Sequence, residues 1–209
     1  MIHVLVLFII VLLLMPKCDN RKIVVVGNAG SMRGSGLGPA IDEFDVVIRV
    51  NDFKTKGFEA DVGSKTTGIH MNETIPKEKF DAILKNNDID LDDIDWLGTR
   101  DRFEFSRAFG FFPYLSKIHQ YTLNTHGTSC RNFTSGTLAV LHFMEKTSNP
   151  IYTAGVTGYN SPGYYYDDSS KTKESAEKQL KKFHCPGEER KLFNRLVESG
   201  KIIRLDSPS

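Results

Sequence analysis

A short apolar run that ends in a glycine-rich segment most constrains the fold of this chain. Residues 22–26 are apolar and β-rich, and the segment GNAGSMRGSGLG follows at residues 27–38. Residues 39–43 can form one helical turn, and residues 45–50 are again β-branched and apolar. A strand, a loop and a second strand in this order are typical of the start of an α/β domain. We therefore predict an α/β fold.

The rest of the chain alternates between predicted helices and strands. Helical spacing and end signals predict helices over residues 76–86, 135–146, 174–183 and 188–198. Apolar, β-rich runs predict strands over residues 94–98, 118–123, 151–157 and 201–205. This alternation implies a mainly parallel sheet flanked by helices. Since no repeat or linker divides the sequence, we predict a single domain over residues 21–209.

The N-terminus is a segment of a different kind. Residues 2–15 are apolar apart from His3, and Pro16 and Lys17 close the run. The run is shorter than the roughly 17–25 residues of a bilayer span. It suits the core of a signal peptide, but a basic segment before it and a small-residue cleavage site after it are missing. A buried first strand is a further alternative, although residues 23–26 already fit that strand. We predict an uncleaved membrane anchor over residues 1–20.

Composition narrows the class of protein. The 209 residues carry 27 basic and 26 acidic side chains, and no long basic run points to nucleic acid. The three cysteines, Cys18, Cys130 and Cys185, allow at most one intramolecular disulfide, and the sequence leaves its identity open. Glycosylation sequons at Asn72 and Asn132 mildly favour a lumenal domain.

Two segments have the residues of an anion or nucleotide site. Glycines after a strand let backbone N–H groups approach a phosphate, but residues 27–38 match neither a dinucleotide fingerprint nor a Walker loop. Thr134, Ser135 and Gly136 open a predicted helix, where hydroxyls and unpaired N–H groups can bind an anion. A tight turn and a plain helix cap are the respective structural alternatives.

A histidine and a group of tyrosines are the other candidates for chemistry. His184 lies between two predicted helices, with Glu189 five residues later, and a loop histidine of this kind can act as a general base. Tyr164, Tyr165 and Tyr166 follow a Ser-Pro-Gly turn, so their phenols can stack or donate to a phosphate. Ordinary packing is the alternative for both groups.

The acidic run DIDLDDID at residues 88–95 contains the Asp-x-Asp pattern of metal-dependent sugar transferases. It precedes a predicted strand and also fits a solvated loop with helix caps. We favour the loop, and we predict no metal site.

Together these segments resemble the animal-type sialyltransferase family, glycosyltransferase family 29. Residues 24–51 resemble its long motif, and the likeness continues through residues 61–67. This stretch looks most like the galactoside α2,6 branch, and the polysialyl-type branch is similar. Residues 133–139, followed by Gly158 and Tyr159, resemble the short motif.

The two remaining family motifs are matched near the C-terminus. Tyr164–Tyr166 resemble the third motif, and His184 with Glu189 resembles the last one, His-x4-Glu. All four motifs occur in family order across residues 22–205. The chain departs from the family at its usual disulfide, because the corresponding positions look like Ile23 and Thr147. Such a bridge is typically worth about 2–4 kcal/mol.

The resemblance implies a Rossmann-like nucleotide-binding domain, of a GT-A-like variant, that catalyses an inverting displacement. An acceptor hydroxyl attacks the anomeric carbon of sialic acid while CMP departs, and His184 accepts the proton. Tyr165 or its neighbour donates to the departing phosphate, and Glu189 orients the His184 loop. The donor-binding residues implied are Asn28, Asn51, Thr134, Ser135, Gly136, Gly158 and Tyr164.

The resemblance also implies the partners and the compartment. The donor is CMP-sialic acid, used without a metal or other cofactor, and the acceptor is a glycoprotein or glycolipid glycan that ends in galactose, N-acetylgalactosamine or sialic acid. The enzyme is a single-pass type II protein of the Golgi membrane with a lumenal catalytic domain.

Three alternatives stay open or are disfavoured. The donor can be another CMP-activated acid sugar such as Kdo, or the chain can bind nucleotides or glycans without catalysis. A Rossmann-type oxidoreductase is disfavoured because no acidic ribose-binding residue follows the second strand at the expected spacing: Asp45 begins the strand, and Arg49 and Asn51 end it.

Overall fold

Seven parallel strands form one sheet in the computed structural model, which describes residues 20–72, 75–99, 118–120, 132–157, 163–167, 178, 182 and 184–206. The strands are β1 (Ile23–Val26), β2 (Val46–Val50), β3 (Gly68–His70), β4 (Trp96–Thr99), β5 (Ile118–Gln120), β6 (Ile151–Ala154) and β7 (Ile202–Arg204). Their order is β5-β4-β3-β2-β1-β6-β7, and every neighbouring pair is parallel. The predicted α/β class is confirmed.

The strand order reverses between β1 and β6. From β1 the chain steps outward through β2 to β5 and then returns to β6, on the other side of β1. In open parallel sheets, ligands bind outside the carboxyl ends of the strands at such a reversal. The carboxyl ends here are Val26 and Ala154, so the topology places the candidate site beside them.

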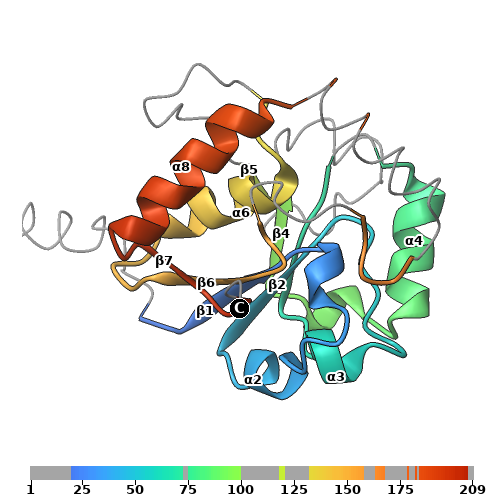
Figure 1. Ribbon diagram of the computed structural model, residues 1–209. Coiled ribbons are helices and arrows are strands. Elements are labelled where there is room, and N and C mark those ends of the chain that lie inside the picture. The colour runs from blue at the N-terminus through green and yellow to red at the C-terminus, as the bar shows by residue number, and fades with distance from the viewer. Residues whose placement is uncertain are drawn as a thin grey trace, which may run out of the picture.

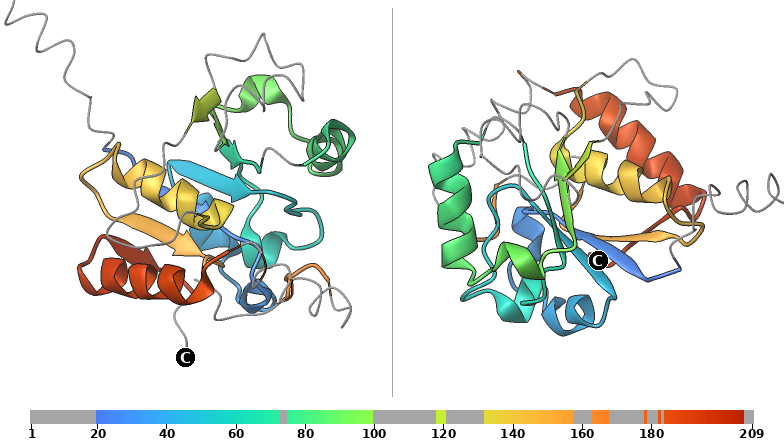
Figure 2. Two further views of the ribbon diagram at one scale, coloured as in Figure 1. Left: turned by 90° about the horizontal axis from the view of Figure 1, so that it is seen from above. Right: turned by 180° about the vertical axis from the view of Figure 1, so that it is seen from behind.

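Helices cover both faces of the sheet (Figure 1). They are α2 (Gly38–Asp42), α3 (Glu59–Val62), α4 (Lys77–Asn86), α6 (Ser135–Met144) and α8 (Pro186–Glu198). Figures 1 and 2 show α6 and α8 side by side, with α2 and α3 on another side of the sheet. Single turns of 3-10 helix cover Gly30–Met32 and Leu91–Asp93.

Alternating residues of β1 belong to two different cores. Ile23 and Val25 pack in the cluster that includes the apolar sides of α6 and α8. Val24 and Val26 pack in the cluster around Ile41, on the side of α2. Because both faces are buried, the strand is a continuous apolar run rather than an alternating one.

Most predicted elements are confirmed to within a few residues. One strand was not predicted, and two predicted elements lie partly outside the described residues. Strand β3 was missed, because three residues that include a glycine give little periodic signal. The predicted strand 118–123 is confirmed over Ile118–Gln120, and its remainder lies outside the described residues. Most of the predicted helix 174–183 also lies outside them, although Lys178 and Lys182 are helical.

The predicted anchor and its boundary at residue 20 stay predictions, because residues 1–19 lie outside the described part of the chain. Within the part that is described, no helix is both long and apolar enough to cross a bilayer.

Candidate active site

The glycine-rich loop lies directly on the carboxyl ends of β1 and β6. The Gly27 N–H donates to the Ala154 carbonyl at 2.8 Å, and the Ala29 N–H donates to the Gly155 carbonyl at 3.3 Å. A Cβ atom on Gly27 would lie 2.3 Å from the Gly155 oxygen, and Gly155 itself has φ 65°. Only glycine at these positions allows the two backbones to meet, so the loop is held over the strand reversal.

Two aspartates hold the glycine-rich loop and the segment behind it in shape. The Asp61 carboxylate accepts from the N–H groups of Gly34 and Gly36, at 2.7 and 3.0 Å. The Asp42 carboxylate accepts from the N–H groups of Ser64 and Lys65, at 3.0 and 2.9 Å. Residues 61–67, which extend the long-motif resemblance, therefore support the loop from behind.

Arg49 is a buried structural residue within the long motif. Its side chain is 1% exposed and donates to the carbonyls of Val62, at 2.6 Å, and Lys65, at 2.7 Å. Burial lowers the pKa of Arg49 to about 10. The guanidinium thus ties β2 to the segment behind the glycine-rich loop.

The two asparagines predicted to bind nucleotide lie at adjacent strand ends. Asn28 donates through Nδ2 to the carbonyls of Val50 and Asp52, at 2.9 and 3.1 Å. Its Oδ1 is buried and has no hydrogen-bond partner among the described residues, so this atom can accept from a ligand. Asn51 has φ 52°, and its Oδ1 accepts from the Asn72 N–H at 2.9 Å.

The tyrosine segment lies against the glycine-rich loop, although more than 100 residues separate them in sequence. Tyr164 forms a backbone bridge with Ala29, and the Tyr165 N–H donates to the Asn28 carbonyl at 3.3 Å. Arg33 Nε donates to the Tyr165 carbonyl at 2.7 Å. The fold therefore brings the segments that resemble the long and third motifs into one site.

The side chain of Tyr165 is held within the protein. Its side chain is 2% exposed, and its hydroxyl accepts from the Lys54 N–H at 2.9 Å and donates to the Lys54 carbonyl. Burial raises the pKa of Tyr165 to about 12. The hydroxyl is thus bound within the protein on both sides, and the phosphate-donating role of Tyr165 or its neighbour stays a prediction.

Tyr164 is the neighbour whose hydroxyl has no hydrogen-bond partner among the described residues. The ring of Tyr164 stacks on that of Tyr166 with centroids 5.3 Å apart, and the Tyr166 hydroxyl donates to the Asp52 carbonyl at 2.7 Å. Burial raises the pKa of Tyr164, while nearby Lys79 opposes the shift and Asp52 adds to it. The Tyr164 phenol therefore stays protonated beside a cationic side chain.

Helix α6 begins beside the carboxyl end of β6. Thr134 caps the helix, and its Oγ1 accepts from the Thr137 N–H at 3.3 Å. A Cβ atom on Gly136 would lie 3.3 Å from Val156 Cγ1, just beyond the end of β6. Ser135, between them, is half-buried. The three short-motif residues predicted at the site thus lie beside β6.

Glu189 joins α8 to the start of α6. Its side chain is 1% exposed, and its carboxylate accepts from the Thr134 N–H at 3.0 Å and from the hydroxyls of Thr134 and Thr137. Burial raises the pKa of Glu189, whereas these hydrogen bonds and the charge of His184 lower it. A carboxylate at a helix N-terminus is also favoured by the helix dipole.

His184 is held by a backbone carbonyl. Its Nδ1 lies 2.8 Å from the Asn132 oxygen. A carbonyl oxygen only accepts, so Nδ1 carries the proton, and in the neutral ring Nε2 then carries the lone pair. Asn132 precedes the α6 cap by two residues, so the histidine and Glu189 meet the same short segment. Gly158, also predicted at the site, lies outside the described residues.

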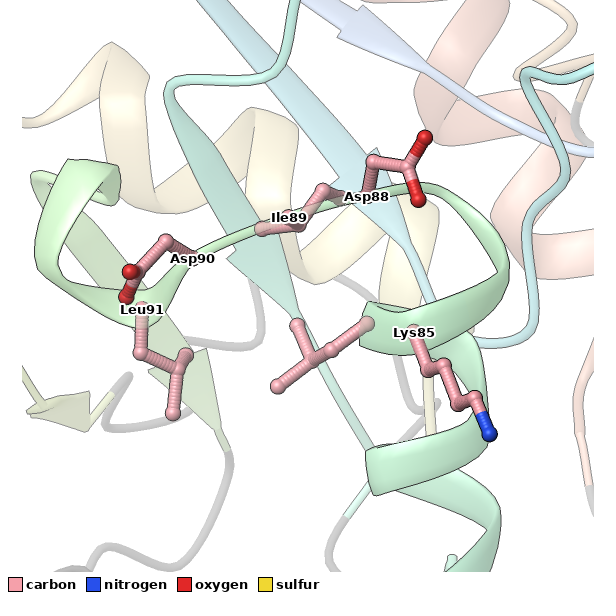
Figure 3. A pocket seen from close by; sticks show the side chains of 6 residues that line it. Lys85, Asp88, Ile89, Asp90 and Leu91 are labelled. Carbon is pink, nitrogen blue, oxygen red and sulfur yellow. The ribbon is translucent and has the colours of Figure 1, made fainter.

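The acidic run follows the C-terminal end of α4 and forms the predicted loop. Asp90 caps the 3-10 turn by accepting from the Asp92 N–H at 2.9 Å, and Asp88 pairs with Lys56. Figure 3 shows an open pocket here in which Asp88 and Asp90 point in different directions. Among the described residues, no three histidine, cysteine, aspartate or glutamate side chains are grouped to hold a metal ion.

The fold defines an α/β domain of the doubly wound class, with the candidate site at the strand reversal. Residues 14–101 match the sequence model of Glycosyltransferase family 29 (sialyltransferase). The comparisons therefore support the family that the four motifs resemble.

Individual relatives agree over part of the chain. The human CMP-N-acetylneuraminate-beta-galactosamide-alpha-2,3-sialyltransferase 4 is 48% identical over 68 residues, which are 32% of this chain and 20% of that protein. The mouse CMP-N-acetylneuraminate-beta-1,4-galactoside alpha-2,3-sialyltransferase is 49% identical over 57 residues, which are 26% of this chain and 15% of that protein. The aligned segment thus spans a fifth or less of these relatives. Both names specify α2,3 linkage, so the predicted α2,6 branch is not confirmed.

Solved structures show the same fold over most of the chain. A mammalian sialyltransferase superposes with a TM-score of 0.59 at 21% identity, covering 92% of this chain and 70% of that one. The sialyltransferase CstII from Campylobacter jejuni, in complex with the substrate analogue CMP-3FNeuAc, gives a TM-score of 0.57 at 17% identity, covering 90% of this chain and 82% of that one.

Proposed function

We propose that this protein transfers sialic acid from CMP-sialic acid to a glycan hydroxyl, with inversion at the anomeric carbon and without a metal. The observation that carries the proposal is the contact between His184 Nδ1 and the Asn132 carbonyl, at 2.8 Å. It orients a histidine beside the segment that opens α6, at the edge of the sheet where a nucleotide is expected to bind.

In the proposed reaction His184 acts as the general base. The acceptor oxygen forms a bond to the anomeric carbon as the bond from that carbon to the CMP phosphate breaks. Nε2 takes the acceptor's hydroxyl proton, while the Nδ1–H bond to Asn132 holds the ring in the required tautomer. Glu189 is in this account a positioning residue, because its carboxylate binds Thr134 and Thr137.

The donor side of the site is proposed from the strand ends and the tyrosine segment. Asn28 and Asn51 contact the nucleotide, with the buried Oδ1 of Asn28 as an acceptor. Ser135 and Gly136, at the N-terminus of α6, bind an anionic group of the donor. The Tyr164 hydroxyl donates to the departing phosphate. CMP leaves as a phosphate monoester, so neutral donors and a helix N-terminus can stabilise it, and we expect no metal requirement.

The proposed setting is the Golgi membrane, with residues 1–20 as a type II anchor and the catalytic domain in the lumen. Its supports are the apolar run at residues 2–15, the sequons at Asn72 and Asn132, and the resemblance to animal sialyltransferases. Glycan acceptors on glycoproteins or glycolipids are the corresponding partners.

A transfer assay tests this function. Full-length protein in detergent is incubated with CMP-sialic acid and glycans that end in galactose, N-acetylgalactosamine or sialic acid, in the presence of a chelator. We expect CMP release together with a product heavier by one sialic acid, and linkage analysis then decides between α2,3 and α2,6. A parallel reaction with CMP-Kdo tests the other donor. Folded protein that binds CMP but transfers neither sugar would refute catalysis and favour a binding function.

A further inference from the structure

The residue that follows the proposed base is part of a disulfide. Cys185 is disulfide-bonded and half-buried, and it is the cap residue of α8. The chain has three cysteines, so the partner of Cys185 is Cys18 or Cys130, both of which lie outside the described residues. We infer that the partner is Cys130, and that the bridge positions His184 for catalysis; the second part rests on the proposed function.

Chain connectivity from Asn132 permits a bridge between Cys130 and Cys185. Cys130 precedes Asn132 by two residues, and the Asn132 oxygen lies 2.8 Å from Nδ1 of His184. Since consecutive Cα atoms are about 3.8 Å apart, the Cα of Cys130 lies within about 7.6 Å of that of Asn132. A disulfide needs a Cα separation of roughly 4.4–6.8 Å. The two short segments that meet at the histidine can therefore be joined by a bridge.

Asn20, which follows Cys18 by two residues, lies at the end of the sheet where β1 and β6 begin. Its carbonyl accepts from Asn149 Nδ2 at 2.9 Å, just before β6 begins. Helix α8 starts at Cys185 and ends beside Lys201, whose carbonyl accepts from the Ile151 N–H at the same end. The helix has 13 residues, which is about 20 Å of length. Two residues of chain beyond Asn20 cover about 7.6 Å, which is too little to reach Cys185.

The bridge would act on the contact that orients the base. Each cysteine lies within two residues of one partner in the His184–Asn132 contact. A covalent link between these segments restricts their separation, and so keeps Nδ1 against the carbonyl. The positions of the usual family bridge are Ile23 and Thr147 here, so this link is a different one. Its formation removes two protons and two electrons from the thiols, which a disulfide oxidant accepts in becoming two thiols.

Peptide mapping tests the pairing independently of activity. Full-length protein is alkylated, digested without reductant and analysed by mass spectrometry, beside the Cys18→Ser variant. We expect one linked pair of peptides that contains Cys130 and Cys185, unchanged in Cys18→Ser. A peptide that links Cys18 to Cys185, or an alkylated Cys185, would overturn the inference.

Kinetics test the positioning role. We expect Cys130→Ser, Cys185→Ser and the double variant to lose kcat equally, by between about 10- and 100-fold, with KM for CMP-sialic acid within about twofold. In a His184→Ala background, the same cysteine substitutions should not lower the residual transfer any further. Reduction of folded wild-type protein with a phosphine gives the same test without a substitution.

An unchanged kcat in the Cys185→Ser variant or in reduced protein would refute the positioning role. If the wild-type protein carries the mapped bridge but shows no transfer, the proposed function fails while the pairing stands.

Discussion

The Glu189 carboxylate on α8 accepts the backbone N–H of Thr134, the cap of α6, at 3.0 Å. It also accepts the hydroxyls of Thr134 and Thr137 and is 1% exposed. The two helices that cover one face of the sheet are thus joined at the point where the short-motif and His-x4-Glu resemblances meet. Glu189 follows His184 by five positions, so this junction also places the loop of the proposed base.

Replacing Glu189 with glutamine should destabilise the fold. The amide offers one acceptor oxygen, and its NH2 group cannot accept from the Thr134 N–H, so a buried donor loses its partner. We expect the free energy of unfolding to fall by about 1–3 kcal/mol in urea titrations. Glu188→Gln is the matched control, because Glu188 is a partly exposed neighbour paired with Lys191. Equal effects of the two substitutions would contradict the assigned role.

Tyr165→Phe should alter stability at alkaline pH. The pKa of Tyr165 is raised from 10.0 to about 12, so the folded state favours the protonated phenol. Its contribution is complete below pH 10 and is lost as the pH rises towards 12. Between pH 10 and 12 the free energy of unfolding of the variant should therefore fall by up to about 3 kcal/mol less than that of the wild-type protein. Denaturant titrations at several pH values measure the difference, and identical slopes would count against the assignment.

Tyr164→Phe should have the opposite profile. Its hydroxyl has no described partner, so stability at pH 7 should change by less than about 0.5 kcal/mol. Loss of a donor to the departing phosphate should lower kcat by about 100-fold. Tyr165→Phe is the matched comparison, because it should lose stability at pH 7 with a smaller effect on kcat per folded molecule. If the two variants exchange these profiles, the assignment of the tyrosines is wrong.

Gly27→Ala should weaken donor binding. The added Cβ would lie 2.3 Å from the Gly155 oxygen, so the glycine-rich loop must move away from the end of β6. We expect the affinity for CMP, measured by calorimetry, to fall by more than about 10-fold, which corresponds to about 1.4 kcal/mol. Gly187→Ala is the control, since a Cβ there meets no atom within 4 Å. Unchanged CMP affinity in Gly27→Ala would show that the glycine-rich loop is not part of the binding site.

The central strands can be predicted from the sequence because their burial on both faces leaves a continuous run of apolar residues. β1 and β2 are buried on both faces and therefore appear as uninterrupted apolar runs. β3 consists of Gly68, Ile69 and His70, and its strand conformation depends on pairing with β2 and β4. Such pairing between segments distant in sequence leaves little local pattern.

The site residues were predicted by type, but their roles depend on tertiary contacts. Three consecutive tyrosines cannot reveal which of them is buried. In the structure Tyr164 and Tyr166 stack on each other, while Tyr165 binds Lys54 within the protein. Likewise, the acceptors of Arg49 are carbonyls of a separate loop. The tertiary contacts are needed to distinguish the supporting residues of the long motif from those that can face a ligand.

The most direct test compares transfer by the wild-type protein and His184→Ala at saturating CMP-sialic acid and acceptor. The account predicts that kcat falls by about 10²- to 10⁴-fold, while the affinity for CMP stays within about twofold, because the histidine acts on the proton and not on the nucleotide. A His184→Ala variant that retains kcat within about threefold of the wild-type value would contradict the assignment of His184 as the base.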